Sequence, residues 1–593
     1  MSAMTAATTA PAPAPAEPAS AAAPRPVRRL RPGVAVTPLR SGLHLRGRRG
    51  SVTLEGSTAL PALWRLLEEP LRGGGVEDLL DGMEPGAPLR AALDTLLGQL
   101  AAHDLLVEGP AGPGDPVPVA QWIAVTAQRP AAAAAALATA RAEVVAGAPD
   151  TPLAGAAGRA LARGGLPVSY TVDPELPAGR VLLYAHGAGP GRGVAAGLCG
   201  ERGYATAPGS AARLRSDAAA LESRLGPATP APAGSTAFVS LLAGAAAHRL
   251  LSSAAGLPDP AHEGEDERLL PGLPAVLLAD ARPLRAEYRT WLGPGRADAD
   301  RPTDLAPAAT LGEALRRVAA LCDARCGVLP EPLPGDLRQL PVPLAACELP
   351  AAARPGGSLV GGAPRLDLAR LEVFCRAAEL LLGGEGFTVG ANPGHARGRA
   401  LREAAAHRSG PPAGLPSVAE ARWAGHPQVR HWWTALTARL AVAARLEVFR
   451  AAPGEEVYRA VVRASASVVL GDAVEATPGD AAAHAALAAV AAVSALSAEA
   501  PAPVRTRPSG GAVAPLAAAG ARTAAWEDCG WTGRWLADTA GREEELQDAL
   551  HRLTGAAFPA FPARAPVPDR ARQLADTLRA FGFTVLYTPE EAR

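Results

Sequence analysis

Lysine is absent from this sequence of 593 residues, so every basic side chain other than histidine is arginine. The absence excludes Schiff-base chemistry, the lysine of a phosphate-binding P-loop and any adenylating mechanism that needs a lysine. Isoleucine and asparagine occur once each, at Ile123 and Asn392. Ala, Gly, Pro and Arg dominate the remainder, a bias typical of a GC-rich genome, and the abundance of alanine is therefore weak support for helix.

Cysteine is also scarce, with six residues over the whole length. Neither an export signal nor an apolar run of membrane-spanning length stands out, so a soluble, cytoplasmic protein is expected. Acidic and basic residues number 58 each, which leaves no global drive toward nucleic acid or membrane. The length allows three or four domains, and residues 1–26, rich in Pro and Ala, predict a disordered lead-in.

Short apolar runs between Pro, Gly and Arg-Gly turn signals predict three strands, at 34–37, 43–46 and 51–54. A further short strand is expected at 105–107. With the helices that lie between them, these strands predict one small domain over residues 27–110.

Three helices are expected after the third strand. Ser57 or Thr58 can cap the first, which ends at a run of glycines. The second spans 76–81, and the third begins near Pro88. Apolar side chains at helical spacing line the first helix (Leu60, Leu63, Trp64, Leu67) and the third (Leu89, Leu93, Leu96, Leu97, Leu100).

This element order, with Leu-Glu-Gly-Ser at 54–57 and Asp-Leu-Leu-Val-Glu at 104–108, resembles the PqqD-like precursor-peptide recognition element (RRE) of ribosomal peptide (RiPP) biosynthesis. The resemblance implies a winged helix that adds a peptide to the edge of its third strand, with apolar side chains of the peptide lying on the third helix. The peptide-binding residues that it implies are Ser51, Val52, Thr53, Leu54, Leu89, Leu93, Leu96, Leu97 and Leu100.

The same segment carries a basic cluster that leaves a second interpretation open. A set of arginines can face nucleic-acid phosphates or an acidic leader peptide equally well. The cluster consists of Arg28, Arg29, Arg31, Arg46, Arg48 and Arg49.

Residues 119–320 predict an α/β domain. A buried strand is expected at 119–125 and a helix at 130–145. The run 180–185 predicts a strand that leads through a glycine-rich turn into a helix at 194–199, the order of a nucleotide-binding crossover. Another strand-to-helix segment is expected at 237–251.

As a dinucleotide fingerprint the glycine-rich turn is incomplete, because Arg192 or Val194 stands where the third glycine belongs. No acidic residue follows about twenty positions on to hold a ribose. The region is similar in arrangement to E1-like (ThiF-like) domains with eroded ATP-handling residues. His248 is expected to be a surface or capping residue.

Cys322 and Cys326 raise the question of a zinc site, with Cys347 and Cys375 as candidate completions. A CxxxC pair lacks the tight turn of a zinc knuckle, and no second close pair exists. No metal site is therefore expected.

Residues 321–593 contain the second resemblance. Five segments follow in order the motifs of YcaO-type domains, which use ATP to activate a backbone amide in azoline and thiopeptide pathways. The segments are 323–328, LARLEVFCRAAELL at 368–381, FTVGANPGHARGRALREAAAHR at 387–408, VVLGDAVEATPGDAAAHAALAAVAAV at 468–493 and RQLADTLRAFGFTVLYTP at 572–589.

This chain departs from the YcaO pattern where the family binds magnesium. The family's first carboxylate helix carries Glu-x-x-Glu-Arg, whereas here Glu403 is followed by Ala406 at the second position. Apolar residues 488–490 stand where the later helix should bring Glu and Gln. Because Mg²⁺ needs several oxygen ligands, a degenerate, non-catalytic YcaO-like domain is expected.

Together the three domains resemble the Ocin-ThiF-like leader-peptide-binding proteins of thiazole/oxazole-modified microcin (TOMM) and thiopeptide pathways. The resemblance implies a pseudoenzyme that binds a precursor's leader peptide and presents the core to a separate YcaO cyclodehydratase, next to a flavin dehydrogenase, with self-association an open question. No catalytic, cofactor-binding or metal-binding residue is then expected in this chain.

Two alternatives stay open. In the first, the chain is a fused ATP-dependent cyclodehydratase in which Glu379 and Glu403 still hold metal. In the second, it is a winged-helix DNA-binding regulator that uses an exposed face made by Arg46, Arg48 and Arg49.

Overall fold

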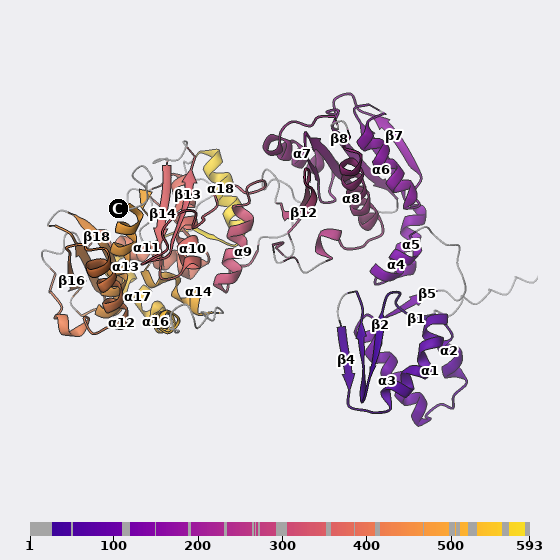
Figure 1. The fold of residues 1–593 in the computed structure, drawn as a ribbon, viewed down its shortest axis with the longest axis horizontal. Coiled ribbons are helices and arrows are strands. Elements are labelled where there is room, and N and C mark those ends of the chain that lie inside the picture. The colour runs from indigo at the N-terminus through magenta and orange to yellow at the C-terminus, as the bar shows by residue number, and fades with distance from the viewer. Residues whose placement is uncertain are drawn as a thin grey trace, which may run out of the picture.

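The computed structural model describes residues 27–587, with gaps at 49–50, 110–118, 149, 188–190, 231–233, 264–265, 267, 271–272, 292–304, 351–356, 385, 409–414, 453, 466–467, 497–503, 506–509, 520–530 and 560–567. The lead-in expected at 1–26 lies outside these residues. Within them the chain mixes helices with several separate sheets, which confirms the expected mixed α and β class. Figure 1 shows an N-terminal module, a middle unit and a C-terminal unit.

The N-terminal module packs three helices against a three-stranded antiparallel sheet of order β2-β3-β4. Leu43 and Leu45 of the central strand are fully buried beside Trp64. Its elements are β1 (Val27–Leu30), β2 (Ala35–Leu39), β3 (Gly42–Arg46), β4 (Ser51–Glu55), α1 (Leu60–Gly73), α2 (Val76–Asp81), α3 (Pro88–Ala102) and β5 (Leu106–Gly109).

A seven-stranded sheet of order β12-β11-β10-β9-β8-β6-β7 organises the middle unit. One core lies between this sheet and α6 and α8, and a second lies on the α7 side. The elements are α4 (Ala120–Thr126), α5 (Pro130–Thr139), β6 (Arg141–Ala146), α6 (Pro152–Arg163), β7 (Val168–Val172), β8 (Arg180–His186), β9 (Arg192–Cys199), β10 (Arg202–Ala205), α7 (Ala211–Leu225), α8 (Thr236–Ala254), η1 (Pro260–His262), β11 (Ala275–Ala281) and β12 (Leu284–Thr290).

Several sequence-based assignments in the middle unit were wrong. The expected helix at 194–199 is part of strand β9, which pairs antiparallel with β8. The glycine-rich segment therefore lies between two strands of a hairpin, and in the described residues the segment that follows it is a strand and does not offer a helix N-terminus to a phosphate. The expected strand at 119–125 is helix α4, and the segment at 237–251 lies entirely within helix α8. The helix expected at 130–145 ends at Thr139 and is followed by strand β6.

His248, expected at the surface, lies half-buried on α8 with its ring edge-on to Trp122 at 5.4 Å. Burial lowers the pKa of His248 below its ordinary value. The imidazole is therefore part of the packing between α4 and α8.

The C-terminal unit contains three small sheets, β13-β14-β19, β15-β20 and β16-β17-β18, with α10 and α13 buried between them. Its elements are α9 (Leu311–Leu321), β13 (Leu344–Leu349), β14 (Gly357–Gly362), α10 (Leu366–Leu382), β15 (Phe387–Gly390), α11 (Pro393–Arg408), η3 (Glu420–Arg422), α12 (Pro427–Thr434), η4 (Ala435–Arg439), β16 (Arg445–Arg450), β17 (Tyr458–Arg463), β18 (Val469–Glu475), α13 (Pro478–Leu496), β19 (Val504–Arg505), η5 (Gly510–Val513), α14 (Ala514–Ala518), α16 (Trp531–Ala540), α17 (Glu543–Thr554), α18 (Asp569–Ala580) and β20 (Thr584–Tyr587).

Helix α9 lies at the boundary expected between residues 320 and 321. Its buried residues Leu311, Ala314 and Val318 belong to the same core as Phe374 of α10. The helix therefore packs with the C-terminal unit.

Two helices of the described chain, α8 and α13, are long and apolar enough to cross a membrane, judged by length and composition alone. No apolar run of this length was predicted from the sequence. Within the fold, 56% of the apolar stretch of α8 and 78% of that of α13 are buried.

Candidate functional site

Strand β4 forms one edge of the N-terminal sheet and is its outermost strand in Figure 1. The Gly56 N–H donates to the Ser41 carbonyl at 3.2 Å, and hydrogen-bonded pairs alternate along an antiparallel ladder. Residues 52 and 54 therefore direct their main-chain groups at β3, and residues 51, 53 and 55 direct theirs at the open edge. The side chains of Val52 and Leu54 pack against the module's core.

The opposite edge strand, β2, is blocked. Because Leu43 and Leu45 direct their main chain at β4, His44 directs its main chain at β2, and the alternation predicts that Thr37 and His44 form a hydrogen-bonded pair. Pro38 is opposite Leu43 and is therefore in a non-hydrogen-bonded pair. The missing N–H of Pro38 would therefore point outward, where proline is tolerated and prevents another strand from adding. The sheet thus offers one edge, β4, for strand addition.

The leucines expected to bind peptide on α3 fall into two classes. Leu89, at the start of the helix, is 43% exposed. The other four are at most 3% exposed, and they hold α3 against α1 and β3 in the module's core. Without opening that core they cannot contact a peptide directly. These four are Leu93, Leu96, Leu97 and Leu100.

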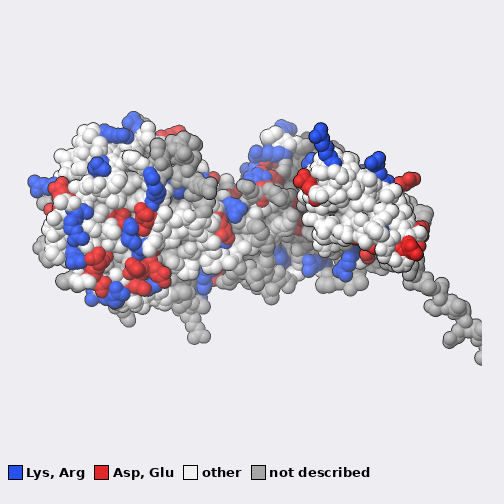
Figure 2. Space-filling model, turned by 90° about the horizontal axis from the view of Figure 1, so that it is seen from below, with Lys and Arg blue, Asp and Glu red and all other residues white. Residues whose placement is uncertain are grey.

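Three arginines of this module's cluster are engaged within the chain, whereas Arg46 of β3 is exposed. Arg28 pairs with Glu77 at 3.0 Å, and Arg48 pairs with Glu263 of the middle unit. Arg31 is 4% exposed and donates to main-chain carbonyls of the middle unit. Arg49 lies outside the described residues. On the face shown in Figure 2, basic and acidic side chains are interspersed, which does not favour the DNA-binding alternative.

In the C-terminal unit a buried guanidinium lies between two carboxylates. Arg402 of α11 makes paired contacts with Glu475 at 3.0 and 2.8 Å, and with Glu543 at 2.8 and 2.6 Å. All three side chains are at most 8% exposed. Burial alone would lower the pKa of Arg402, but the two carboxylates outweigh it and raise that pKa above its ordinary value. Arg402 therefore stays charged.

A second guanidinium repeats the arrangement one turn earlier on α11. Arg399 contacts Glu379 at 2.5 Å and Glu372 at 3.2 Å, both on α10. Glu379 also accepts from the Val389 N–H at 3.0 Å and from Arg376 at 3.1 Å. Burial still raises the pKa of Glu379 above its ordinary value.

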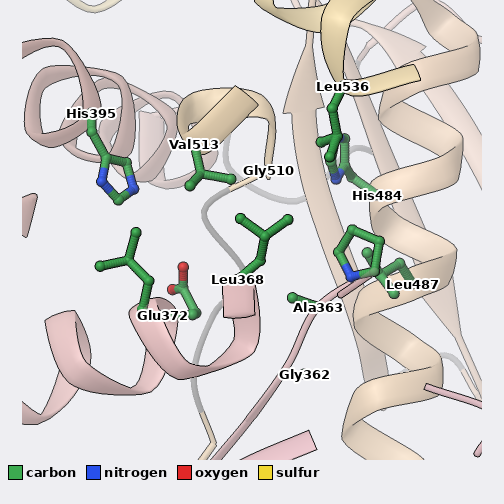
Figure 3. Close-up of a pocket in the computed structure, with 12 residues that line it drawn as sticks. Gly362, Ala363, Leu368, Glu372, His395, His484, Leu487, Gly510, Val513 and Leu536 are labelled. Carbon is green, nitrogen blue, oxygen red and sulfur yellow. The ribbon is translucent and has the colours of Figure 1, made fainter. Parts of the chain in front are cut away.

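A pocket opens beside these pairs between α10, α11, α13 and η5. Figure 3 shows His395 and Glu372 on one side of it and His484 on the other, with apolar side chains between them. Both imidazoles are at most 3% exposed, and burial lowers the pKa of each, so both are neutral at pH 7. The Ala391 N–H donates to His395 Nδ1 at 3.2 Å, which places the proton on Nε2.

This pocket can hydrogen-bond a guest, because Nε2 of His395 and of His484 has no partner among the described residues. It offers little to Mg²⁺, whose preferred ligands are carboxylate and carbonyl oxygens. Within the described chain no cluster of three or more His, Cys, Asp or Glu side chains is placed to hold a metal ion.

The two carboxylates of the fused-enzyme alternative lie in different surroundings. Glu379 is buried in the arginine pairs described above, whereas the Glu403 side chain is 50% exposed and lies 3.9 Å from His407. The cysteines considered for zinc, Cys322, Cys326, Cys347 and Cys375, are all buried and unbridged.

Sequence reasoning missed the arginines at the centre of this site and three of their four carboxylate partners. Arg399 and Arg402 stand three residues apart on one helix, so they share a face. That face is buried, and buried arginine is rare unless paired. Small apolar residues stand one turn before the pair, at 396, and between its two members, at 400. They could have signalled that this face is buried, but not which side chains pair with the arginines.

Comparisons with known proteins complete this description. No family model and no curated protein matches the chain. Among solved structures, similar chains are "Heterocyclase in complex with substrate and Cofactor", with a TM-score of 0.47, and "Structure of the heterocyclase TruD", with a TM-score of 0.42. Each is 13% identical and covers 95% of this chain and 94% of its own. At these scores the likeness assigns neither fold nor activity to this chain.

Proposed function

We propose that this chain is a non-catalytic scaffold that binds the leader of a ribosomally made precursor peptide and presents its core to a separate YcaO cyclodehydratase for thiazoline or oxazoline formation. The observation that carries the proposal is the open β4 edge. There the main chain of residues 51, 53 and 55 is available for pairing, while Pro38 blocks the other edge of the same sheet.

The leader would add as a strand beside β4. Main-chain hydrogen bonds would supply affinity, and alternate side chains would supply selectivity. Leu89 is the one α3 residue of the expected set that is exposed enough to touch such a strand. The four buried leucines then act indirectly, by fixing α3 beside the sheet.

The scaffold role, rather than a fused enzyme, is supported by the state of the C-terminal carboxylates. Arg399 and Arg402 pair with the buried glutamates, so these side chains are not free to ligate Mg²⁺. Catalysis is then left to the partner. The scaffold contributes by tethering, which raises the effective concentration of the core at the partner's active site.

Titration of Mg-ATP into the full chain tests this assignment. We expect no saturable heat in calorimetry up to about 1 mM nucleotide, since a site of useful affinity would be occupied well below that concentration. A titration with Mg²⁺ alone supplies the background. A saturable isotherm with one nucleotide per chain would instead support the fused cyclodehydratase.

The variant Glu403→Ala is expected to leave the heterocycle yield of a reconstituted pathway within about twofold of wild type. Its carboxylate is half exposed and lies 3.9 Å from the exposed His407, and surface pairs of this kind contribute little. The yield is measured by mass spectrometry of the precursor. A tenfold loss would return Glu403 to a catalytic role.

A further inference from the structure

Strand β7 is a second open edge, at the end of the seven-stranded sheet, and Figure 1 shows it on the outer side of the middle unit. It pairs with β6 on one side only, in parallel. Tyr170 is 51% exposed and Val172 is 50% exposed, although both lie in the strand. Such exposure of large apolar side chains in a sheet edge marks a surface suited to pairing.

The outward main-chain groups of β7 can be identified. The Ala142 N–H donates to the Pro167 carbonyl, and the Asp173 N–H donates to the Ala146 carbonyl, each at 2.9 Å. Odd-numbered residues therefore direct their main chain at β6. The N–H and C=O groups of Val168, Tyr170 and Val172 point away from the sheet.

The two edges of this sheet are protected differently. Strand β12, at the opposite end, carries Arg285, Glu287 and Arg289, and charged side chains discourage edge pairing. Strand β7 reads Val-Ser-Tyr-Thr-Val, with no charge and no proline. An edge of this kind is unprotected unless something covers it.

The sequence of β7 is complementary to itself. In an antiparallel pair of two β7 strands with a two-fold axis at Tyr170, Val168 lies opposite Val172 of the second copy, and Ser169 lies opposite Thr171. Each pair matches like with like, valine with valine and hydroxyl with hydroxyl. The outward groups at 168, 170 and 172 also meet each other in this register, so every one finds a partner.

Charges at the two ends of β7 favour the same orientation. The exposed Arg141 and Arg163 lie near its start. The exposed Glu175 follows its end, where Asp173 is already paired with Arg215 at 3.2 Å. Antiparallel self-pairing brings the acidic end of one copy to the basic start of the other. Parallel pairing would bring like charges together.

We propose that β7 is the interface for a second copy of this chain, which pairs antiparallel about Tyr170 and joins the two sheets into one. Five residues a side bury less than the 1,200 Å² or so of a stable interface. The flanking helix α6, over which the Tyr170 ring lies beside Gly158, would add to that area. The expected dimer is accordingly of micromolar strength.

Cysteine cross-linking tests the register. In the proposed dimer the Cα atoms of the two copies of residue 170 are about 5.5 Å apart, a separation that a disulfide spans. Mild oxidation of the full-length Tyr170→Cys variant at about 50 µM should therefore yield mostly cross-linked dimer on a denaturing gel. In Val172→Cys the two sulfur-bearing residues are offset by about 13 Å along the strands, so cross-linking should fall at least fivefold.

The matched control is Leu284→Cys, which places a thiol on the opposite edge of the same sheet at a residue that is 49% exposed. The proposal is overturned if Tyr170→Cys cross-links no more than this control or than Val172→Cys.

Sedimentation gives a second readout that needs no new thiol. Wild type should dimerise, and Tyr170→Pro, which removes an outward N–H and no bond to β6, should be monomeric. A dimer that survives Tyr170→Pro, or a monomeric wild type at 200 µM or so, also rejects the interface.

Discussion

Replacing Arg402 with methionine is expected to destabilise the C-terminal unit by about 3–5 kcal/mol. The substitution leaves the Glu475 and Glu543 carboxylates buried without the guanidinium that contacts both. The loss of a buried charge partner costs more than the pair contributes, because an isolated charge cannot regain its hydration in the core. Urea unfolding followed by tryptophan fluorescence measures the effect, since Trp432 and Trp535 lie in this unit's core.

Two further variants separate charge from packing. Arg397→Met removes a half-exposed arginine from the same helix, 3.3 Å from Asp548, and should cost no more than about 1 kcal/mol. Combining Arg402→Met with Glu475→Gln and Glu543→Gln should recover much of the loss, because amides replace the unpaired charges. If Arg402→Met is no worse than Arg397→Met, the proposed pairing is not what holds these carboxylates.

Proline at Thr53 is expected to weaken leader-peptide binding by about 2 kcal/mol, roughly thirtyfold in Kd. The Thr53 N–H points to the open edge of β4, so proline removes a donor that the peptide would use and adds a ring in its path. Because no bond to β3 is lost, the module should stay folded. Fluorescence polarization with a labelled leader peptide measures the affinity.

The neighbouring position supplies the contrast. Proline at Val52 removes an N–H directed at Leu45 of β3 and should lower the melting temperature as well as the affinity. Thr53→Ala keeps the main-chain donor and loses the hydroxyl contact with His44, so its affinity should stay within about threefold. An unaltered affinity in Thr53→Pro would exclude this edge as the pairing site.

The N-terminal module was the part most accessible from sequence. Its turns are marked by Gly and Pro, its leucines recur at helical spacing, and its second helix was expected and found at 76–81. Each of these signals depends on residues close together in the chain, so a single sequence is enough to predict the turns and helices that they mark. The helical spacing of the α3 leucines did not reveal that Leu93, Leu96, Leu97 and Leu100 are buried in the core and are not exposed to a ligand.

The middle unit shows where local patterns fail. Residues 194–199, Val-Ala-Ala-Gly-Leu-Cys, are compatible with helix or with a buried strand. The strands on either side decide the matter, since β8 and β10 both pair with this segment. Because this segment was predicted as a helix, the hairpin between β8 and β9 was interpreted as a nucleotide-binding turn.

The buried pairs of the C-terminal unit were not predictable for a different reason. Glu475 lies 73 positions from Arg402, and Glu543 lies 141 positions away. Side chains so far apart meet only once the whole unit has folded. A Glu-x-x-Glu pattern along α11 depends on local spacing alone and therefore points to the exposed Glu403, not to the distant carboxylates that meet Arg402.

Arg31 bears on how a bound leader would be delivered. Its guanidinium donates to Asp104 of its own module and to the carbonyls of Ala124 and Ala127 in the middle unit, at 3.0 and 2.7 Å. These hydrogen bonds attach the N-terminal module to the middle unit, so the module would not move freely on the connecting segment. A leader bound to β4 would then leave the module at a fixed position and in a fixed direction. The length of peptide between leader and core would therefore determine which core positions the partner can reach, and diffusion of the module would not.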